Sequence, residues 1–169
     1  FVKTDLNSKV VIGYVGRIEY SKGIDVFAEA LPSNENIEAI VIGSGSVEKL
    51  LYNVDCHFLG FLDNAIKYIS GIDIVVVPSR SEGFGRIVLE ASMQGCKVVA
   101  SDIPAHREIE SFGAKIEFFK VGDANECRQA IKKIMKIPSS EVWDENLAKF
   151  FSPKKHAKIF GQIYDELTR

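Results

Sequence analysis

One strand-to-helix junction indicates the fold of this chain, Ile72-Asp73-Ile74-Val75-Val76-Val77-Pro78 followed shortly by Ser81-Glu82-Gly83-Phe84-Gly85-Arg86-Ile87-Val88-Leu89-Glu90. The first part is mostly apolar, which predicts a buried strand that ends at Pro78. After Gly85 the apolar residues take helical spacing, at Ile87, Val88, Leu89, Ala91 and Met93. In open α/β sheets, ligands bind where a strand passes into its helix. The stretch therefore predicts a ligand site as well as a fold.

Two carboxylates flank the start of the predicted helix. Glu82 lies in the loop, and Glu90 lies just over one turn into the helix. The helix N-terminus between them offers unpaired N–H groups and the positive end of a dipole, which favour an anion. Carboxylates on both sides suit a ligand with hydroxyl groups on either side of a phosphate, as in a nucleotide sugar. The alternatives are that Glu90 only complements the helix dipole and that Gly83-Phe84-Gly85 is a plain turn.

The alternation of strand and helix continues along most of the chain. Apolar runs predict strands at Val10–Val15, Ile37–Ile42, Cys56–Leu59, Ile72–Val77, Lys97–Ser101 and Ala114–Phe118. Helical spacing predicts helices at Ile24–Leu31, Val47–Tyr52, Asn64–Ser70, Arg86–Gln94, Asn125–Ile137, Ser139–Lys149 and Pro153–Leu167. We therefore expect an α/β fold, a Rossmann-like doubly wound parallel sheet of about six strands with helices on both faces. Residues 1–169 would form a single domain, in which residues 139–169 are C-terminal helices.

Composition narrows the function classes. Hydrophobic residues make up 46% and charged residues 26% of the 169-residue chain, which is typical of a globular domain. The net charge of −2 argues against a nucleic-acid partner and against an acidic lipid surface. No apolar run reaches the roughly 18 residues that a membrane span needs. No signal peptide is visible, and a start at Phe1 leads us to expect a fragment.

The cysteines and histidines do not indicate a metal site. The three cysteines, whose spacing is not that of metal ligands, are Cys56, Cys96 and Cys127. They are interpreted as reduced thiols of a cytoplasmic protein. The three histidines, which form no local cluster and are interpreted as structural or solvated, are His57, His106 and His156.

A second group of candidate residues follows the first strand, in Gly16-Arg17-Ile18-Glu19-Tyr20-Ser21-Lys22-Gly23. Gly16 allows a sharp turn, and Arg17 and Lys22 leave the same loop. Two cations over one crevice suit a diphosphate, whose charge must be neutralised when its bond to a sugar breaks. The alternatives are that Lys22 is solvated at a helix start and that Arg17 pairs with Glu19.

Several segments together resemble a known family. They lie in order within residues 10–137 and are Tyr14-Val15-Gly16-Arg17, Lys22-Gly23-Ile24-Asp25, Val41-Ile42-Gly43-Ser44-Gly45, Phe58-Leu59-Gly60-Phe61, Pro78-Ser79, Glu82-Gly83-Phe84-Gly85, Glu90-Ala91, Val98-Val99-Ala100-Ser101 and Glu108. With them the chain resembles the C-terminal, nucleotide-sugar-binding half of a retaining glycosyltransferase with two Rossmann domains, the GT-B fold. The family is glycosyl transferases group 1, which includes sucrose synthases and many lipopolysaccharide and capsule enzymes.

The resemblance implies roles for individual residues. Arg17 and Lys22 would grip the diphosphate and stabilise the leaving group, and Glu82 would contact the hydroxyls of the donor sugar. The remaining donor-binding residues would be Glu90 at the ribose hydroxyls, Phe61 near the base, Gly16 and Gly43 where the backbone turns or approaches the ligand, and Gly83, Phe84, Gly85, Arg86 and Ile87 through their N–H groups.

Arg86 departs from the apolar residue that many family members carry at this position. An arginine at a helix N-terminus opposes the dipole, so an anionic partner is expected. Either the donor phosphate or Glu90, four residues further on, would serve.

The resemblance also implies a mechanism and partners. The sugar would be transferred with retention to an acceptor held by an N-terminal Rossmann domain that this chain lacks, so the chain alone would bind donor without turnover. No Asp-X-Asp is placed for a metal, so we expect metal independence and no cofactor. The enzyme would be cytoplasmic, with the full-length protein at the inner face of the membrane. The alternatives are a sugar-nucleotide 2-epimerase and a non-catalytic nucleotide-binding module; a dehydrogenase is disfavoured because no Gly-X-Gly-X-X-Gly follows the first strand.

Overall fold

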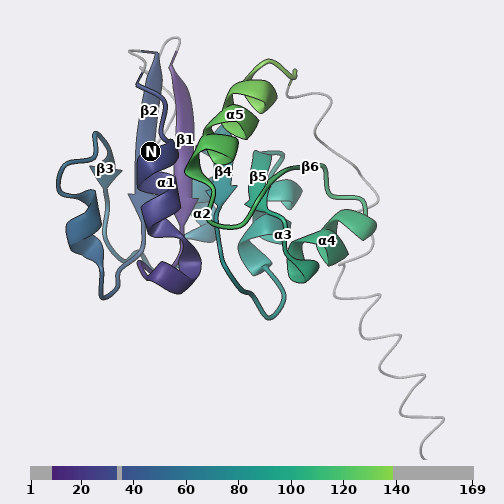
Figure 1. Ribbon diagram of the computed structural model, residues 1–169, viewed down its shortest axis with the longest axis horizontal. Helices are drawn as coiled ribbons and strands as arrows, with labels where there is room; N and C mark the ends of the chain where they lie inside the picture. Colours follow the sequence, from purple (N-terminus) through teal and green to yellow (C-terminus); the bar gives the residue numbers. More distant parts are fainter. Residues whose placement is uncertain (1–8, 34–35, 139–169) are drawn as a thin grey trace, which may run out of the picture.

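A six-stranded parallel sheet forms the centre of the computed structural model, which describes residues 9–33 and 36–138 (Figure 1). In spatial order its strands are β3 (His57–Phe58), β2 (Ile37–Ile42), β1 (Val10–Val15), β4 (Ile74–Val77), β5 (Lys97–Ser101) and β6 (Ile116–Phe119). The helices are η1 (Tyr20–Lys22), α1 (Ile24–Ala30), η2 (Glu48–Leu51), α2 (Ile66–Ile69), α3 (Arg86–Met93), α4 (Pro104–Ser111) and α5 (Ala124–Met135). The predicted α/β, Rossmann-like doubly wound fold is confirmed.

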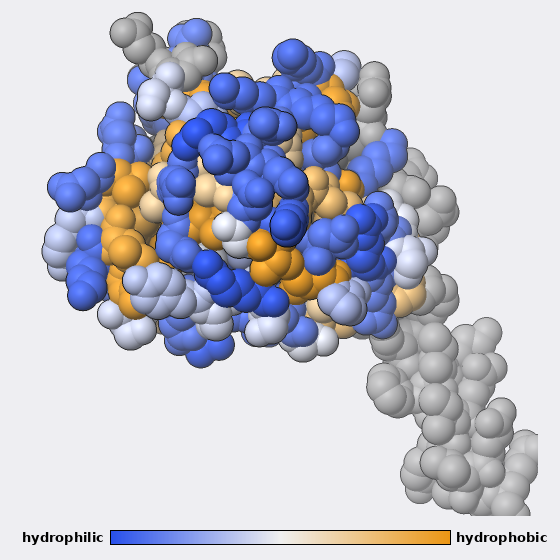
Figure 2. Space-filling view, in the orientation of Figure 1, coloured by the Kyte–Doolittle hydropathy of each residue, from blue (hydrophilic) through white to orange (hydrophobic). Residues whose placement is uncertain are grey.

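The central strands β1 and β4 are apolar along their whole length because helices cover both faces of the sheet. Ile12 and Tyr14 of β1 face one side, with α1 and α5, and Val11 and Val15 face the other, with α2, α3 and α4. This alternation follows from the two-residue period of a strand. The outer sides of α1 and α5 belong to a largely hydrophilic surface (Figure 2).

The strand order reverses between β1 and β4. From β1 the chain builds outward to β2 and β3, and it then returns to β4 on the other side and continues to β5 and β6. The β1–β4 register pairs Ile12 with Ile74 and Gly13 with Val75. Loops leave the carboxyl ends of these two neighbours in opposite directions, so a crevice opens between them at the switch point.

The predicted elements differ from the observed ones mainly at their ends. The strand expected at Cys56–Leu59 is only His57–Phe58, and the helix expected at Val47–Tyr52 is a 3₁₀ turn. The helices expected within residues 139–169 lie outside the described residues.

Helix α4 was not predicted at all. It begins at Pro104, a residue that suits the first helical position, and its buried residues are Ala105, His106 and Ile109. The helix is short and holds few apolar residues, although Ala105 and Ile109 lie four residues apart on one face. Within the described ranges, no helix is both long and apolar enough to cross a membrane.

Candidate functional site

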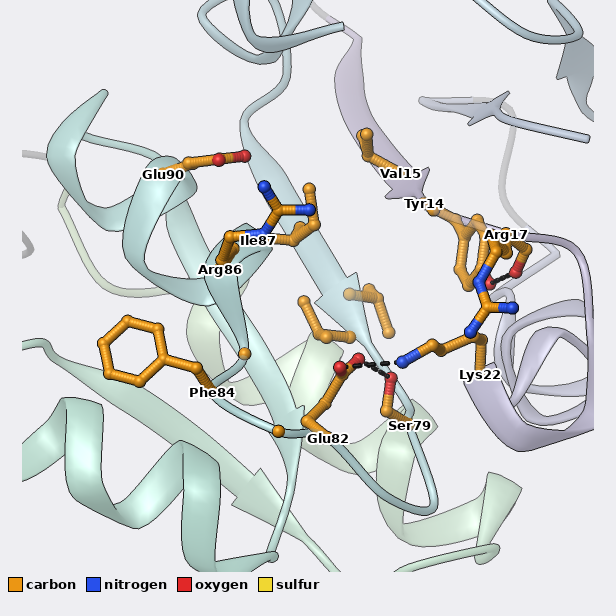
Figure 3. Close-up of a pocket in the computed structure, with 15 residues that line it drawn as sticks. Tyr14, Val15, Arg17, Lys22, Ser79, Glu82, Phe84, Arg86, Ile87 and Glu90 are labelled. Atoms are coloured by element: carbon orange, nitrogen blue, oxygen red, sulfur yellow. Dashed lines mark hydrogen bonds and ion pairs between the residues drawn. The ribbon is translucent and has the colours of Figure 1, made fainter.

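A cavity of about 600 Å³ lies at the switch point, between the ends of β1 and β4 and the start of α3 (Figure 3). Every predicted site residue except Gly43 and Phe61 lines it. The predicted residues that the fold brings together are Gly16, Arg17, Lys22, Glu82, Gly83, Phe84, Gly85, Arg86, Ile87 and Glu90. The roles that the resemblance implies for them stay predictions.

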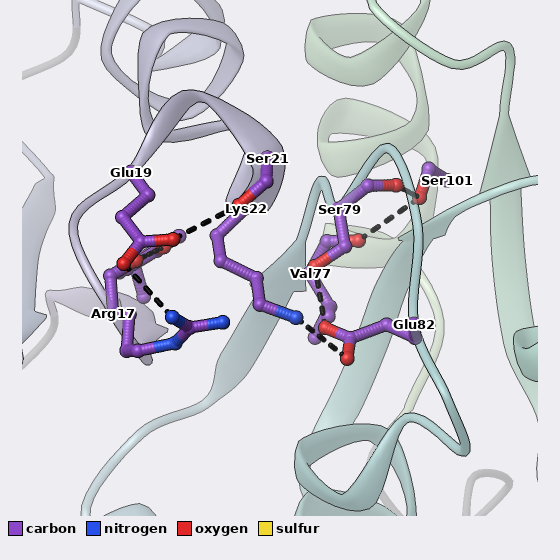
Figure 4. A network of polar contacts seen from close by, with 9 residues as sticks. Arg17, Glu19, Ser21, Lys22, Val77, Ser79, Glu82 and Ser101 are labelled. Carbon is purple, nitrogen blue, oxygen red and sulfur yellow. Dashed lines mark hydrogen bonds and ion pairs between the residues drawn. The ribbon is translucent and has the colours of Figure 1, made fainter.

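Lys22 and Glu82 face each other across the floor of the cavity (Figures 3 and 4). Their Nζ and Oε2 atoms are 2.7 Å apart, and the two side chains are only 18% and 20% exposed. The hydroxyl of Ser79 donates to the other carboxylate oxygen at 2.7 Å. Lys22 therefore points into the cavity, so the alternative of a solvated lysine at a helix start is wrong.

The Glu82 carboxyl is held in its charged form. Partial burial acts to raise its pKa, but the hydrogen bonds from Lys22 and Ser79 outweigh burial, so the pKa lies below its usual value. A charged Glu82 is an acceptor only, and it suits hydroxyl donors.

Arg17 forms an ion pair with Glu19, which was the alternative to a phosphate-binding role. Its Nη1 atom lies 2.9 Å from Oε1 of Glu19, while 67% of the arginine side chain is exposed. An exposed ion pair of this kind contributes only about 0.2–1 kcal/mol, so it does not hold Arg17 against a stronger anion. The backbone of the loop after β1 is held in place, because the hydroxyl of the buried Tyr14 donates a hydrogen bond to the Arg17 carbonyl.

Arg86 and Glu90 lie on the α3 side of the cavity (Figure 3). Burial raises the pKa of Glu90, and the positive charge of Arg86 opposes that rise. No ion pair or hydrogen bond of the Arg86 guanidinium is recorded within residues 9–33 and 36–138. Its charge is therefore still available to an anion in the cavity.

Helix α3 opens directly onto the cavity. Gly85 is its N-cap residue with φ 80°, and no side chain caps the first N–H groups. These N–H groups add positive charge to the rim that Arg17, Lys22 and Arg86 already provide. The Phe84 ring extends away from Glu82 and Lys22 and packs beside the core (Figure 3).

Gly43 and Phe61 lie outside the cavity. A Cβ atom at Gly43 would lie 1.8 Å from the Gly16 carbonyl oxygen, so this glycine lets two neighbouring backbone turns meet. Phe61 follows β3 and is 71% exposed. Their predicted contacts with the ligand stay predictions.

Two further residues beside the site were not singled out from the sequence. Arg80 forms a bidentate pair with Asp25 of α1, at 2.9 and 2.7 Å, and thereby links the loop of Glu82 to the loop of Lys22. His106 of α4 lies fully buried against Gly85. Neither had a local signal, because each contact joins segments far apart in the sequence. Among the described residues, no group of three or more His, Cys, Asp or Glu side chains is arranged to hold a metal ion.

Known proteins are similar to this chain in sequence. Residues 2–150 match the family model described as glycosyl transferases group 1. The O-antigen biosynthesis glycosyltransferase WclY of Escherichia coli is 33% identical over 95% of this chain and 48% of its own length. The lipopolysaccharide core biosynthesis mannosyltransferase LpcC of Rhizobium leguminosarum bv. viciae is 28% identical over 97% of this chain and 53% of its own. The chain thus spans about half the length of these curated relatives.

Solved structures share the fold. Anabaena Alr3699/HepE in complex with UDP-glucose superposes with a TM-score of 0.79 and 20% identity, over 96% of this chain and half (50%) of that one. The C-terminal domain of the group 1 glycosyl transferase LpcC from Francisella tularensis has a TM-score of 0.68 and 24% identity, over 84% of this chain and 85% of that one. The sequence match, which covers most of the chain, decides its family: it belongs to the glycosyl transferases group 1.

Proposed function

We propose that this chain is the donor-binding domain of a retaining glycosyltransferase and holds a nucleoside-diphosphate sugar in the switch-point cavity. One observation carries the proposal: the cavity joins three cationic side chains and the open start of α3 to two carboxylates on different elements of its wall. A diphosphate fits the positive part, and the hydroxyl groups of two sugars fit the carboxylates.

In this proposal Lys22 contacts the diphosphate without leaving Glu82. An ammonium group has three donors, and the contact with Glu82 uses one of them. Arg17 gives up its exposed contact with Glu19 and turns to the phosphate. Together they stabilise the charge that develops on the leaving diphosphate, so the reaction needs positioning and electrostatics rather than a metal ion.

Glu82 contacts the donor sugar and Glu90 the ribose. The acceptor is held by a second, N-terminal Rossmann domain of the same polypeptide, and transfer proceeds with retention. The proposed setting is polysaccharide or lipopolysaccharide synthesis in the cytoplasm, at the inner face of the membrane. WclY and LpcC, by their names, act in O-antigen and lipopolysaccharide core biosynthesis.

Thermal unfolding of the chain with UDP-glucose, GDP-mannose and ADP-glucose, in the presence of EDTA, tests the donor site. A ligand at 100 times its dissociation constant adds about 2.7 kcal/mol to the free energy of unfolding. A shift with at least one of these compounds is expected, and no shift with any of them, or a shift that EDTA abolishes, contradicts the proposal.

The reaction itself is tested on the longer polypeptide that contains an acceptor domain. NMR of the anomeric proton of the product shows retention or inversion directly. A 2-epimerised sugar nucleotide in place of a glycoside would instead identify an epimerase, and binding without any product would identify a non-catalytic module.

A further inference from the structure

His106 is a fully buried histidine beneath the loop that carries Glu82. It lies on α4 and is 0% exposed. On one side its ring contacts Gly85, where an added Cβ atom would lie 2.9 Å from Cδ2 and 3.4 Å from Nε2. Gly85 is the last residue before α3, so the ring supports the turn that leads into the helix.

The protonation of the ring follows from its contacts. Nδ1 lies 2.8 Å from the Ser101 carbonyl oxygen, which can only accept, so Nδ1 carries a hydrogen. Burial lowers the pKa of His106 below its usual 6.5, although the Ser101 contact and the charge of Glu82 act to raise it. In the resulting neutral ring, Nε2 is a hydrogen-bond acceptor.

This acceptor, Nε2, makes no hydrogen bond to any residue that the structure describes. Nε2 is buried and has no hydrogen-bond partner among the described residues. An unsatisfied buried polar group costs about 1–3 kcal/mol, and such groups are few in native structures. A cost of this size at the edge of a binding cavity is explained if the partner arrives when the ligand binds.

Both ends of the Glu82 loop connect to His106. At the loop's start, the Ser101 hydroxyl donates to the Ser79 carbonyl, and the Ser79 hydroxyl donates to Glu82 (Figure 4). Ser101 is also the residue that fixes Nδ1. At the loop's end, Nε2 faces Gly85. The imidazole therefore stands between the two anchor points of the segment that presents Glu82.

We infer that His106 positions the Glu82 loop for the donor sugar, with Nε2 accepting a backbone N–H of Gly83 or Gly85 when this turn closes on the sugar. The inference rests on the proposed function. Because the bond forms only in the closed arrangement, it lowers the free energy of the sugar-bound state and not that of the free protein. His106 is a positioning residue and does not contact the substrate itself.

Two substitutions separate the two ends of the ring. The amide of His106→Asn reaches the position of Nδ1 and keeps the contact with Ser101, whereas the amide of His106→Gln reaches the position of Nε2. Calorimetry on the chain would measure the affinities for each sugar nucleotide and its plain nucleotide: UDP-glucose and UDP, GDP-mannose and GDP, and ADP-glucose and ADP. We expect H106N to weaken the sugar nucleotides about tenfold and the plain nucleotides less than twofold, with H106Q within about threefold of wild type for all.

The outcomes distinguish this inference from the proposed function. If the wild type binds none of UDP-glucose, GDP-mannose and ADP-glucose, the proposed function is overturned and the inference with it. If the wild type binds but H106N loses nothing, or loses sugar nucleotide and nucleotide equally, only the inference is overturned. Should H106N fail to fold, ¹⁵N NMR of wild-type His106 decides: Nε2 should shift on adding UDP-glucose or GDP-mannose and not on adding UDP or GDP.

Discussion

Lys22 and Glu82 form an ion pair of 2.7 Å across the switch point, although one precedes α1 and the other precedes α3. The pair ties together the two loops that leave β1 and β4. It also holds the Lys22 ammonium and the Glu82 carboxylate in defined positions before a ligand binds. Groups that are already in place lose less freedom on binding, so this arrangement favours affinity.

Lys22→Met should remove the phosphate cation while keeping the length of the side chain. We expect nucleoside diphosphate affinity to fall at least tenfold, because hydrogen bonds to charged groups contribute about 1.5–3 kcal/mol each. Calorimetry on the folded variant measures the loss. Lys133→Met is the control. The Lys133 Nζ lies 2.8 Å from Oε1 of Glu117, and Lys133 does not line the cavity. Equal affinities in the two variants would remove Lys22 from the site.

The same pair predicts an acid-dependent stability. The folded pKa of Glu82 lies below its usual 4.5, so the carboxylate stabilises the fold at pH values above 4.5, and this contribution is lost as pH falls through the folded pKa. We expect the difference in unfolding free energy between wild type and Glu82→Gln to be largest near neutral pH and to shrink below pH 4.5. Urea unfolding across that range tests it, and a difference that grows on acidification would contradict the assigned charge.

Arg80 and Asp25 should couple the two loops energetically. Besides the bidentate pair with α1, the Arg80 guanidinium donates to the Tyr20 carbonyl and the Arg80 backbone N–H donates to the Ser21 carbonyl at 2.9 Å, so two hydrogen bonds also join Arg80 to the loop of Lys22. A double-mutant cycle with Arg80→Ala and Asp25→Ala should give a coupling of about 0.5–1 kcal/mol in unfolding free energy. Arg80→Ala should also weaken UDP or GDP severalfold, because Lys22 is then less well fixed.

The Arg107–Asp102 pair offers the control for that experiment. It is also bidentate, at 2.7 Å for both contacts, but it does not line the cavity. Arg107→Ala should lower stability to a similar extent and leave nucleotide affinity unchanged. If both arginine variants lose the same affinity, Arg80 has no specific effect on the site.

The sequence was sufficient for the sheet and for the place of the site. Segments such as Val10–Val15 and Ile74–Val77 are apolar on both faces, as expected of a covered parallel strand, and neighbouring parallel strands end at one common edge of the sheet. The residues before and after those strand ends therefore had to meet, and the cavity contains Arg17 and Glu90 as a result.

Contacts between loops could not be predicted from the sequence. That Lys22 meets Glu82, or that Arg80 meets Asp25, depends on how two loops fold after their strands end, and no periodicity encodes this. Helix α4 was missed for a different reason: it is short and mostly polar, although Ala105 and Ile109 lie on one face. From the sequence, His106 was interpreted as structural or solvated because it belongs to no local cluster. Its ring nitrogen Nε2, which is buried without a hydrogen-bond partner in the described part of the chain, can be recognised only in the three-dimensional structure.

Glu90 offers the sharpest test of which sugar lies at which end of the cavity. If Glu90 accepts hydrogen bonds from ribose hydroxyls, Glu90→Gln should weaken UDP or GDP by about 1–3 kcal/mol and the 2′-deoxy nucleotide by much less. The same assignment predicts a pH dependence. Burial raises the pKa of Glu90 above its usual value of 4.5, so Glu90 is protonated, and the wild type loses its preference for the ribonucleotide, as the pH falls toward a value above 4.5. In Glu90→Gln the preference should be small at every pH. Calorimetry with the ribo and deoxy forms at several pH values measures both effects. Equal losses for the two nucleotides would instead mean that Glu90 serves only Arg86 and the start of α3.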